Sequence, residues 1–314
     1  MKPINVLMDV DPGVDDIFAL ILAATHPDIN LLGVTTCFGN KVLRRTNRNA
    51  LMLMDLIGRK DIPVAKGSET PLVKPLYPYS VFDNDDAHGG SGVGWAEVVE
   101  FDNQNHPLDA VEFMAKTVRE CEGEVALVPV GPLTNIAKFI QKYPELLEKI
   151  SVIALMGGSV ENGNMSPYAE VNIYFDPEAA AIVFGCGVPV VMCGLEGTWS
   201  SYIKREEWAP VLEGDEPLKK WLYNALHCYA RVYEQSKPGV VIHDSMPLVW
   251  LINRELVHTK PAYVTIECGD NEHNGQTVCD FECDPALFNA QVALGCEREE
   301  LVKMFKASIE ALFR

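Results

Sequence analysis

Short apolar runs alternate with longer stretches of helical periodicity over the first two thirds of the chain. The apolar runs predict buried strands at 4–8, 31–36, 125–130, 152–156 and 188–193. The stretches between them predict helices at 17–25, 43–57, 108–121, 133–141 and 177–184. This alternation is typical of a doubly wound α/β fold, in which helices cover both faces of a mostly parallel sheet.

The rest of the chain has a less regular pattern. A helix-rich piece over 206–236 and a helix over 246–253 precede strand-like segments at 262–267, 276–281 and 290–294, and a last helix runs to the carboxyl end. The stretch 67–106 is too long and too polar for an ordinary connection, which leaves an active-site loop or local disorder. Its GGSGVG sequence is no phosphate-binding motif, because it follows no strand and opens no helix.

Polar side chains follow the predicted strands. Ligands of open α/β sheets bind beyond the carboxyl ends of the strands, so these residues are the candidate site. Asp9 and Asp11 close the first strand. The other candidates at strand ends, or shortly downstream of them, are Asn40, Val130, Met156, Asn164, Glu170 and Asn172. His243 and Asp244, in IHDSM, stand just before a predicted helix.

The motif DVDPGVDD places four aspartates within eight residues. Asp15 and Asp16 fit the first turn of a helix, where free N–H groups and the helix dipole favour carboxylates. Asp9 and Asp11 are two apart on a strand and share a face, so each would raise the pKa of the other unless a cation compensated. A hard cation such as calcium or magnesium, enclosed by the Pro12-Gly13 turn, would relieve this repulsion.

Composition narrows the classes of partner. The chain has 314 residues, of which 48% are hydrophobic, and no apolar stretch long enough to cross a bilayer, so we expect one or two globular domains. A formal net charge of −18 at pH 7 disfavours nucleic acid and anionic membranes as partners and suits a divalent cation. The start of the chain lacks an export pattern, which predicts a cytoplasmic location. Nine cysteines, an odd number, indicate reduced thiols, and their spacing offers little support for zinc.

Two protein families begin with a strand and an aspartate pair. Haloacid-dehalogenase-like phosphatases carry Asp-x-Asp-x-Thr/Val and use the first aspartate as nucleophile with magnesium, but here Gly13 departs from that pattern. DVDPGVDDIFAL instead resembles the inosine-uridine preferring nucleoside hydrolases. Further segments resemble that family in the same order, from end to end: GVTTCFGN, VPVGPLTNIA, IALMGGSVENGN, AEVNIYFDPEAA, IHDSMP and DFECDPALFNAQVAL.

The resemblance implies a single domain over 1–314 that hydrolyses the N-glycosidic bond of ribonucleosides to ribose and free base. It also implies a calcium ion, Ca2+, held by Asp11, Asp16, the Val130 carbonyl and Asp244. Asp11 would be the general base for a calcium-bound water. The members of this family also suggest a homodimer or homotetramer.

The resemblance further implies a substrate subsite for each half of the nucleoside. Asp15 would meet a ribose hydroxyl above Met156, and the remaining sugar contacts would be Asn40, Asn164, Glu170 and Asn172. His88 and His243 occupy base-contacting positions of the pyrimidine and inosine-uridine branches, and His243 is the candidate acid for the leaving base. Tyr229 and Tyr233 either face the base or belong to the core. No tryptophan falls on a purine-stacking position, which favours pyrimidine or inosine-type substrates.

Some points stay open at this level. Glu196 stands where the family more often has aspartate, and the sequence does not say what the longer side chain does. A magnesium-dependent phosphatase built on Asp9 and a nucleoside-binding protein without catalysis are the alternative interpretations. An assay for reducing sugar released from nucleosides and for phosphate released from an ester would separate the phosphatase from a nucleoside hydrolase.

Overall fold

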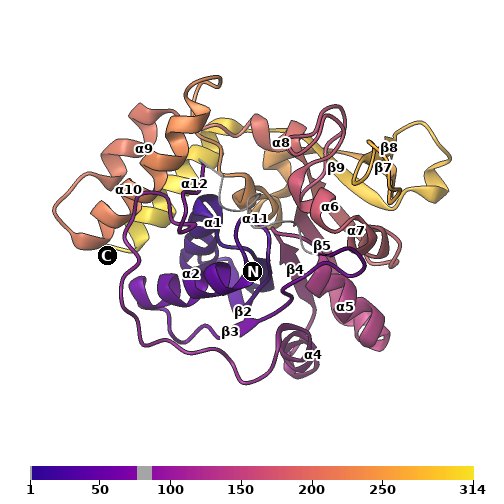
Figure 1. Cartoon of the computed structure of the whole chain (residues 1–314), viewed down its shortest axis with the longest axis horizontal. Helices are drawn as coiled ribbons and strands as arrows, with labels where there is room; N and C mark the ends of the chain where they lie inside the picture. The colour runs from indigo at the N-terminus through magenta and orange to yellow at the C-terminus, as the bar shows by residue number, and fades with distance from the viewer. Residues whose placement is uncertain (1, 76–86) are drawn as a thin grey trace.

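A nine-stranded sheet forms the centre of the molecule (Figure 1). The structure is a computed structural model and describes residues 2–75 and 87–314. The strand order is β3-β2-β1-β4-β5-β6-β9-β7-β8. All neighbours pair in parallel except β7, which is antiparallel to both β9 and β8. The strands are β1 (Ile4–Val10), β2 (Ile29–Thr36), β3 (Val64–Lys66), β4 (Val125–Pro129), β5 (Ile150–Met156), β6 (Val190–Cys193), β7 (Val257–Ile266), β8 (Thr277–Asp280) and β9 (Ala290–Cys296).

Helices follow most of the strands. They are α1 (Val14–Thr25), α2 (Leu43–Leu56), α4 (Ala110–Glu120), α5 (Thr134–Lys142), α6 (Val171–Phe175), α7 (Pro177–Phe184), α8 (Leu195–Trp199), α9 (Arg205–Leu212), α10 (Pro217–Tyr233), α11 (Met246–Ile252) and α12 (Arg298–Ala311). Short 3-10 turns are η1 (Pro144–Lys149), η2 (His243–Ser245), η3 (Arg254–Leu256) and η4 (Pro285–Leu287).

The sheet is buried on both faces. Val6, Met8 and Val10 of β1 belong to the core shared with α1, α2 and α10 to α12, whereas Leu7 belongs to the core shared with α4, α5 and α7. Alternate residues of a strand point to opposite faces, so an apolar run without polar interruption suits a strand covered on both sides. Figure 1 shows the two groups of helices on either side of the central strands.

The doubly wound architecture predicted from the sequence is confirmed, and the boundaries differ in instructive ways. Helix α1 begins at Val14, before the predicted start at 17, and so includes Asp15 and Asp16 in its first turn. Strand β7 begins five residues before the predicted start at 262. Pro261 lies inside this strand, at a level where β8 does not pair with it, so its missing N–H breaks no bond to β8. The short elements β3, α6 and α8 were not predicted.

The strand order fixes where a ligand can bind. The chain leaves β1 toward β2 and β3 on one side and returns on the other side with β4, so the topological switch point lies between β1 and β4. The segments that follow these two strands start at Asp11 and Val130. Among the described residues, no helix has the length and apolar character needed to cross a bilayer.

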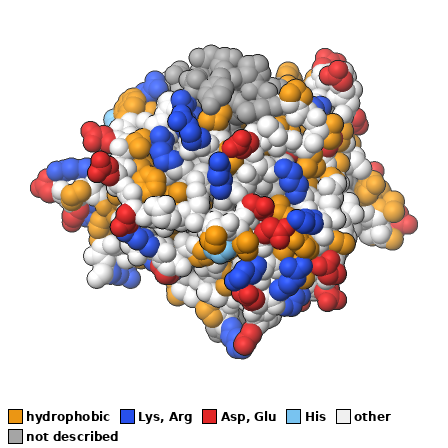
Figure 2. Space-filling view, turned by 60° about the horizontal axis from the view of Figure 1, so that its bottom comes forward, with side chains coloured by type: hydrophobic (Ala, Val, Ile, Leu, Met, Phe, Trp, Pro, Cys, Tyr) orange, Lys and Arg blue, Asp and Glu red, His pale blue; other side chains and the backbone are white. Residues whose placement is uncertain are grey.

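The charged side chains of the surface are distributed differently from those at the carboxyl ends of the strands. On the face shown in Figure 2, acidic, basic and apolar side chains are interspersed. The aspartates of the DVDPGVDD motif, in contrast, are all less than a tenth exposed. Carboxylates buried without compensation are costly, so their environment is the place to look for function.

Candidate active site

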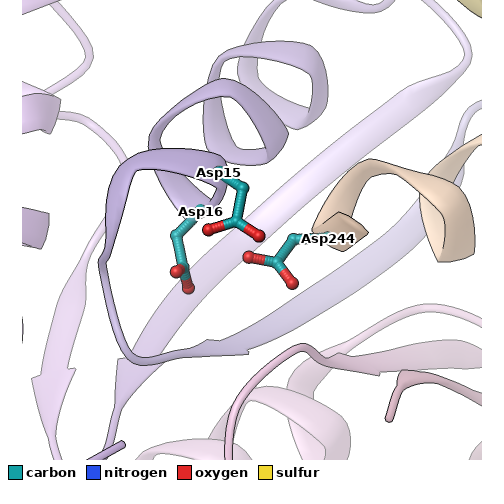
Figure 3. A group of neighbouring side chains, drawn as sticks. All are labelled: Asp15, Asp16 and Asp244. Atoms are coloured by element: carbon teal, nitrogen blue, oxygen red, sulfur yellow. The ribbon is translucent and has the colours of Figure 1, made fainter. Parts of the chain in front are cut away.

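Three carboxylates converge at the amino end of α1. Asp15 points from the first turn of this helix toward Asp244, which comes from η2, and the Asp16 carboxylate lies beside them (Figure 3). Each offers an oxygen atom within 4.8 Å of the other two. Burial raises the pKa of Asp16 to about 6 and that of Asp244 well above its usual range, and the neighbouring aspartates raise the pKa of Asp244 further. The three carboxylates therefore repel one another when they are all ionised, unless a positive charge compensates them.

Asp11 adjoins this cluster and is held by glycine-lined backbone. Its Oδ2 accepts a hydrogen bond from the Asn40 backbone N–H at 2.6 Å, and the Asn40 side chain donates to Asp16 at 3.1 Å. A Cβ at Gly39 would lie 2.0 Å from Oδ2, and one at Gly131 would lie 2.5 Å from Oδ1. Only glycine fits these two positions, so their identity is part of the site although it carries no chemistry of its own.

Asp9 has a different environment from Asp11. Its Oδ1 accepts hydrogen bonds from the Thr35 hydroxyl at 2.6 Å and from the Asn135 amide at 2.8 Å. Burial raises its pKa to about 6. The structure thus ties one oxygen of Asp9 to β2 and α5, while its Oδ2 is buried without a hydrogen-bond partner among the described residues. Asp9 is not a member of the three-carboxylate cluster.

The loops after β4 and β5 supply further polar groups. The Asn172 amide donates to the Val130 carbonyl at 2.9 Å and to the Met156 carbonyl at 3.2 Å, so it ties the ends of the two strands together. Glu170 caps α6 by accepting from the Asn172 and Ile173 N–H groups. Burial raises the pKa of Glu170 to about 7, and its Oε1 has no hydrogen-bond partner among the described residues.

Asn164 is the predicted sugar contact whose side chain is exposed. Its Oδ1 accepts a hydrogen bond from the Val171 N–H at 2.9 Å. This contact orders the loop before α6. The structure therefore shows a local backbone role for Asn164, at the segment between Glu170 and Asn172 in the chain.

The acidic residues fit a divalent cation. All the available donors are oxygen atoms, which hard cations such as calcium and magnesium prefer. Asp11 Oδ1 and Asp15 Oδ1 are buried and have no hydrogen-bond partner in the part of the chain that the structure describes. Burial first, and then the Asp16 charge, raise the pKa of Asp11 well above its usual range. A bound cation would relieve this repulsion, and a cation or a hydroxyl of a ligand would satisfy the unpartnered oxygens.

His88 lies across from Asp15 with a defined tautomer. Its Nδ1 accepts the Val14 backbone N–H at 2.9 Å, so the ring proton of the neutral side chain is on Nε2. The same Nδ1 is 3.8 Å from Asp15 Oδ1, too far for a hydrogen bond. A Cβ at residue 13 would lie 2.4 Å from His88 Nδ1, which explains why glycine stands there.

A hydrogen-bonded chain of side chains extends from His243. The Tyr229 and Tyr233 hydroxyls are 2.9 Å apart, and the Tyr233 hydroxyl is 3.2 Å from His243 Nε2. His243 Nδ1 is 2.7 Å from the Thr198 hydroxyl, which itself donates to the Leu195 carbonyl. Thr198 therefore accepts from Nδ1–H, and Nε2 accepts from Tyr233. Burial lowers the pKa of His243 to about 3, so this imidazole is neutral at pH 7.

Helix α8 supplies residues that sequence reasoning missed. Besides Thr198, it carries Trp199, whose ring meets the His243 ring edge-on at 4.9 Å between centroids. Glu196 accepts hydrogen bonds from the Val160 N–H at 2.8 Å and the Glu161 N–H at 3.0 Å. Glu196, which stands where the family more often has aspartate, thus holds the loop after β5. The only signal in the sequence is the motif GLEGTW after a predicted strand.

Most of the predicted site residues meet at one edge of the sheet. Residues 76–86, which belong to the long polar stretch 67–106, lie outside the described residues, whereas His88, in the same stretch, lies 3.8 Å from Asp15. Together the fold and this edge define an α/β protein with an acidic, oxygen-rich site at its topological switch point. Such a site suits a cation and a hydroxylated ligand.

Comparison with known proteins gives the family. The sequence model of the inosine-uridine preferring nucleoside hydrolases matches residues 6–303, so the chain belongs to this family. It is 38% identical over 308 residues to the pyrimidine-specific ribonucleoside hydrolase RihA of Shewanella sp. strain MR-7, a match that covers 97% of this chain and 95% of the relative. The enzyme is a ribonucleoside hydrolase.

Solved structures agree with this assignment. The plant nucleoside hydrolase PpNRh1 superposes with a TM-score of 0.90 at 30% identity and covers 98% of this chain and 99% of its own. A purine-preferring ribonucleoside hydrolase from Gardnerella vaginalis has the same TM-score and identity, with 98% of each chain covered. Relatives named for pyrimidine and for purine substrates thus share this fold, so the fold alone does not define the base.

Proposed function

We propose that this enzyme hydrolyses the N-glycosidic bond of pyrimidine ribonucleosides, inosine-type nucleosides or both, with Asp11 as the general base and Ca2+ as the cation. The observation that carries the proposal is the pairing of two kinds of side chain at one edge of the sheet. Buried carboxylates suited to a cation and to ribose hydroxyls face a chain of aromatic hydroxyls and imidazoles suited to a base. The pyrimidine-specific relative supports a pyrimidine substrate.

The cation would be held by Asp11, Asp16, Asp244 and the Val130 carbonyl. When bound, calcium orients hydroxyl groups of the sugar and lowers the pKa of a water molecule. Asp15 belongs to the same carboxylate cluster and lies 3.8 Å from His88, and we assign it to a ribose hydroxyl because the family resemblance implies that role. Calcium binding should therefore survive Asp15→Asn and be lost in Asp16→Asn.

Asp11 would take the proton of the attacking water. The Asn40 N–H fixes one carboxylate oxygen at 2.6 Å, which leaves Oδ1 to accept the proton. Attack at the anomeric carbon passes through a state with oxocarbenium character, and the surrounding negative charges stabilise that state. Asn40, Met156, Asn172 and Glu170 line the same edge and are the proposed ribose contacts. Asn164, which orders the loop before α6, is the remaining proposed sugar contact.

The leaving base would be met by the aromatic side of the site. His88 presents its Nε2–H as a donor, and the Tyr229 and Tyr233 hydroxyls provide further polar contacts. Because His243 Nε2 accepts from the Tyr233 hydroxyl, we propose that His243 orients this hydroxyl so that its oxygen can accept a hydrogen bond from an N–H group of the base. The proton that the departing base takes up would then come from solvent water, while the hydrogen bond from His88 Nε2–H stabilises the base as it leaves.

A substrate panel tests this proposal. The calcium-loaded enzyme is incubated with uridine, cytidine, inosine, adenosine and a generic phosphate ester, and release of reducing sugar and of phosphate is measured. We expect sugar from uridine, cytidine or inosine, and no phosphate. Preferential hydrolysis of adenosine would refute the proposed base preference, and binding of ribose analogues without turnover would refute catalysis by this site.

A further inference from the structure

The segment 88–94, which carries His88, is folded as a compact turn against α2. The Gly94 N–H donates to the His88 carbonyl at 2.8 Å, and the Gly92 N–H donates to the Gly89 carbonyl at 3.2 Å. The φ values are +65° at Gly89, +87° at Gly92 and +62° at Gly94, in the left-handed region that other residues rarely adopt. The position of His88 therefore depends on how this turn is held.

Asn49 of α2 joins this turn to the aspartate motif. Its side-chain amide donates to the Pro12 carbonyl at 3.0 Å and to the Ser91 carbonyl at 3.1 Å. Pro12 directly follows Asp11, and Ser91 is three residues from His88. A single amide thus links the backbone beside the proposed base to the backbone that carries His88.

The amide is itself fixed in place. Asn49 is 1% exposed, and its Oδ1 accepts from Arg48 Nε at 3.1 Å and from an Arg48 terminal nitrogen at 2.8 Å. That nitrogen also donates to the Ser91 carbonyl at 2.7 Å. A Cβ at Gly92 would lie 2.6 Å from the Asn49 amide nitrogen, so the turn approaches Asn49 as closely as a backbone can. Both hydrogens of the amide and its oxygen are used.

We propose that Asn49 is a positioning residue for nucleoside hydrolysis, which holds His88 in register with Asp11 so that His88 Nε2–H can reach the base. The inference rests on the proposed function, in which His88 contacts the base. An apolar side chain would leave the Pro12 and Ser91 carbonyls without this donor, so a purely structural role also calls for an amide, and the test has to separate the two roles. The two carbonyls it binds belong to the two segments whose relative position decides whether base and sugar are engaged together.

The test uses Asn49→Asp and the matched control Asn47→Asp in the full-length, calcium-loaded enzyme. Asn49→Asp keeps the volume and the acceptor for Arg48, but it places an oxygen opposite the Pro12 and Ser91 carbonyls. Asn47 is 7% exposed on the same helix and accepts from the Thr36 hydroxyl at 3.1 Å, a bond that aspartate retains. Both variants add one negative charge, so a general effect of charge or of helix damage appears in both.

The readout compares two substrates in two backgrounds. One substrate is the nucleoside that the wild-type enzyme hydrolyses best, and the other is p-nitrophenyl riboside, whose leaving group needs no contact with His88. We expect Asn49→Asp to lower kcat/KM for the nucleoside about tenfold or more, with a loss below about threefold for p-nitrophenyl riboside. In a His88→Ala background the selective loss should disappear, because residues that act through one another are not additive.

Three results would overturn the inference: equal losses with both substrates, a selective loss that persists without His88, or behaviour equal to that of Asn47→Asp. If Asn49→Asp does not fold, Arg48→Gln tests the same link from the partially exposed side, with the same two substrates and a smaller expected loss. Failure of the proposed function would look different, because the wild-type enzyme itself would then release no sugar from any nucleoside.

Discussion

Replacement of Asp11 by asparagine probes the proposed base with little change in shape. Asp11 Oδ2 accepts from the Asn40 N–H at 2.6 Å, so the oxygen of the new amide will keep that bond and the NH2 group will occupy the Oδ1 position. The variant therefore has a donor where a proton must be accepted. It also lacks one of the charged cation ligands. General-base catalysis contributes about 10²–10⁴ in rate, so kcat should fall at least about 10²-fold, or about 2.7 kcal/mol.

The matched control for this variant is Asp9→Asn, the same change two residues earlier. Asp9 Oδ1 binds Thr35 and Asn135, and an amide oxygen can accept both bonds, so kcat should fall less than about tenfold. Steady-state release of reducing sugar at saturating calcium, with the metal content measured, gives both values. A calcium-loaded Asp11→Asn enzyme with near-normal kcat would refute the role of Asp11. A larger loss in Asp9→Asn would revive a mechanism built on Asp9.

Three further expectations follow from the contacts of the site. His243→Ala should depress hydrolysis of uridine or inosine strongly and spare p-nitrophenyl riboside, whereas equal losses would leave His243 with a structural role only. Glu196→Asp, one methylene shorter, should lose its bonds to the loop at Val160 and raise KM severalfold with a smaller change in kcat, and an unchanged KM would contradict this. In the metal-free protein, burial raises the folded-state pKa of Asp15 and Asp16 to about 6, above the value in the unfolded chain, so the protonated carboxyls stabilise the folded state. This stabilisation is lost as pH rises through about 6. Its melting temperature should be higher at about pH 5 than at about pH 7.5, and calcium should reduce that difference.

The sequence was sufficient to locate the acidic edge. Asp11 and Val130 follow strands that neighbour one another at the switch point, and parallel strands bring their carboxyl ends together. Asp15 and Asp16 lie in a first helical turn, as the local pattern predicted. These placements depend on short-range pattern and on a topology that the alternation of strands and helices defines.

Contacts between distant segments could not be predicted in this way. Thr198 of α8 meets His243, and Asn49 of α2 meets Ser91, because tertiary packing brings together segments that are distant in the sequence, and local patterns do not specify such contacts. The direction of the His243 hydrogen bonds depends on the Thr198 hydroxyl, and the low pKa of His243 depends on its burial, and the local sequence reveals neither. Glu196 shows the same limit: its departure from aspartate was visible in the sequence, and its partners were not.

The most direct test of the central claim is ribose release from nucleosides before and after removal of the metal. The protein is treated with a chelator until elemental analysis finds less than about one ion per ten chains, and it is then titrated with calcium. The account predicts that hydrolysis falls with the metal and returns when calcium refills the site formed by Asp11, Asp16 and Asp244. Undiminished hydrolysis by metal-free protein would contradict it.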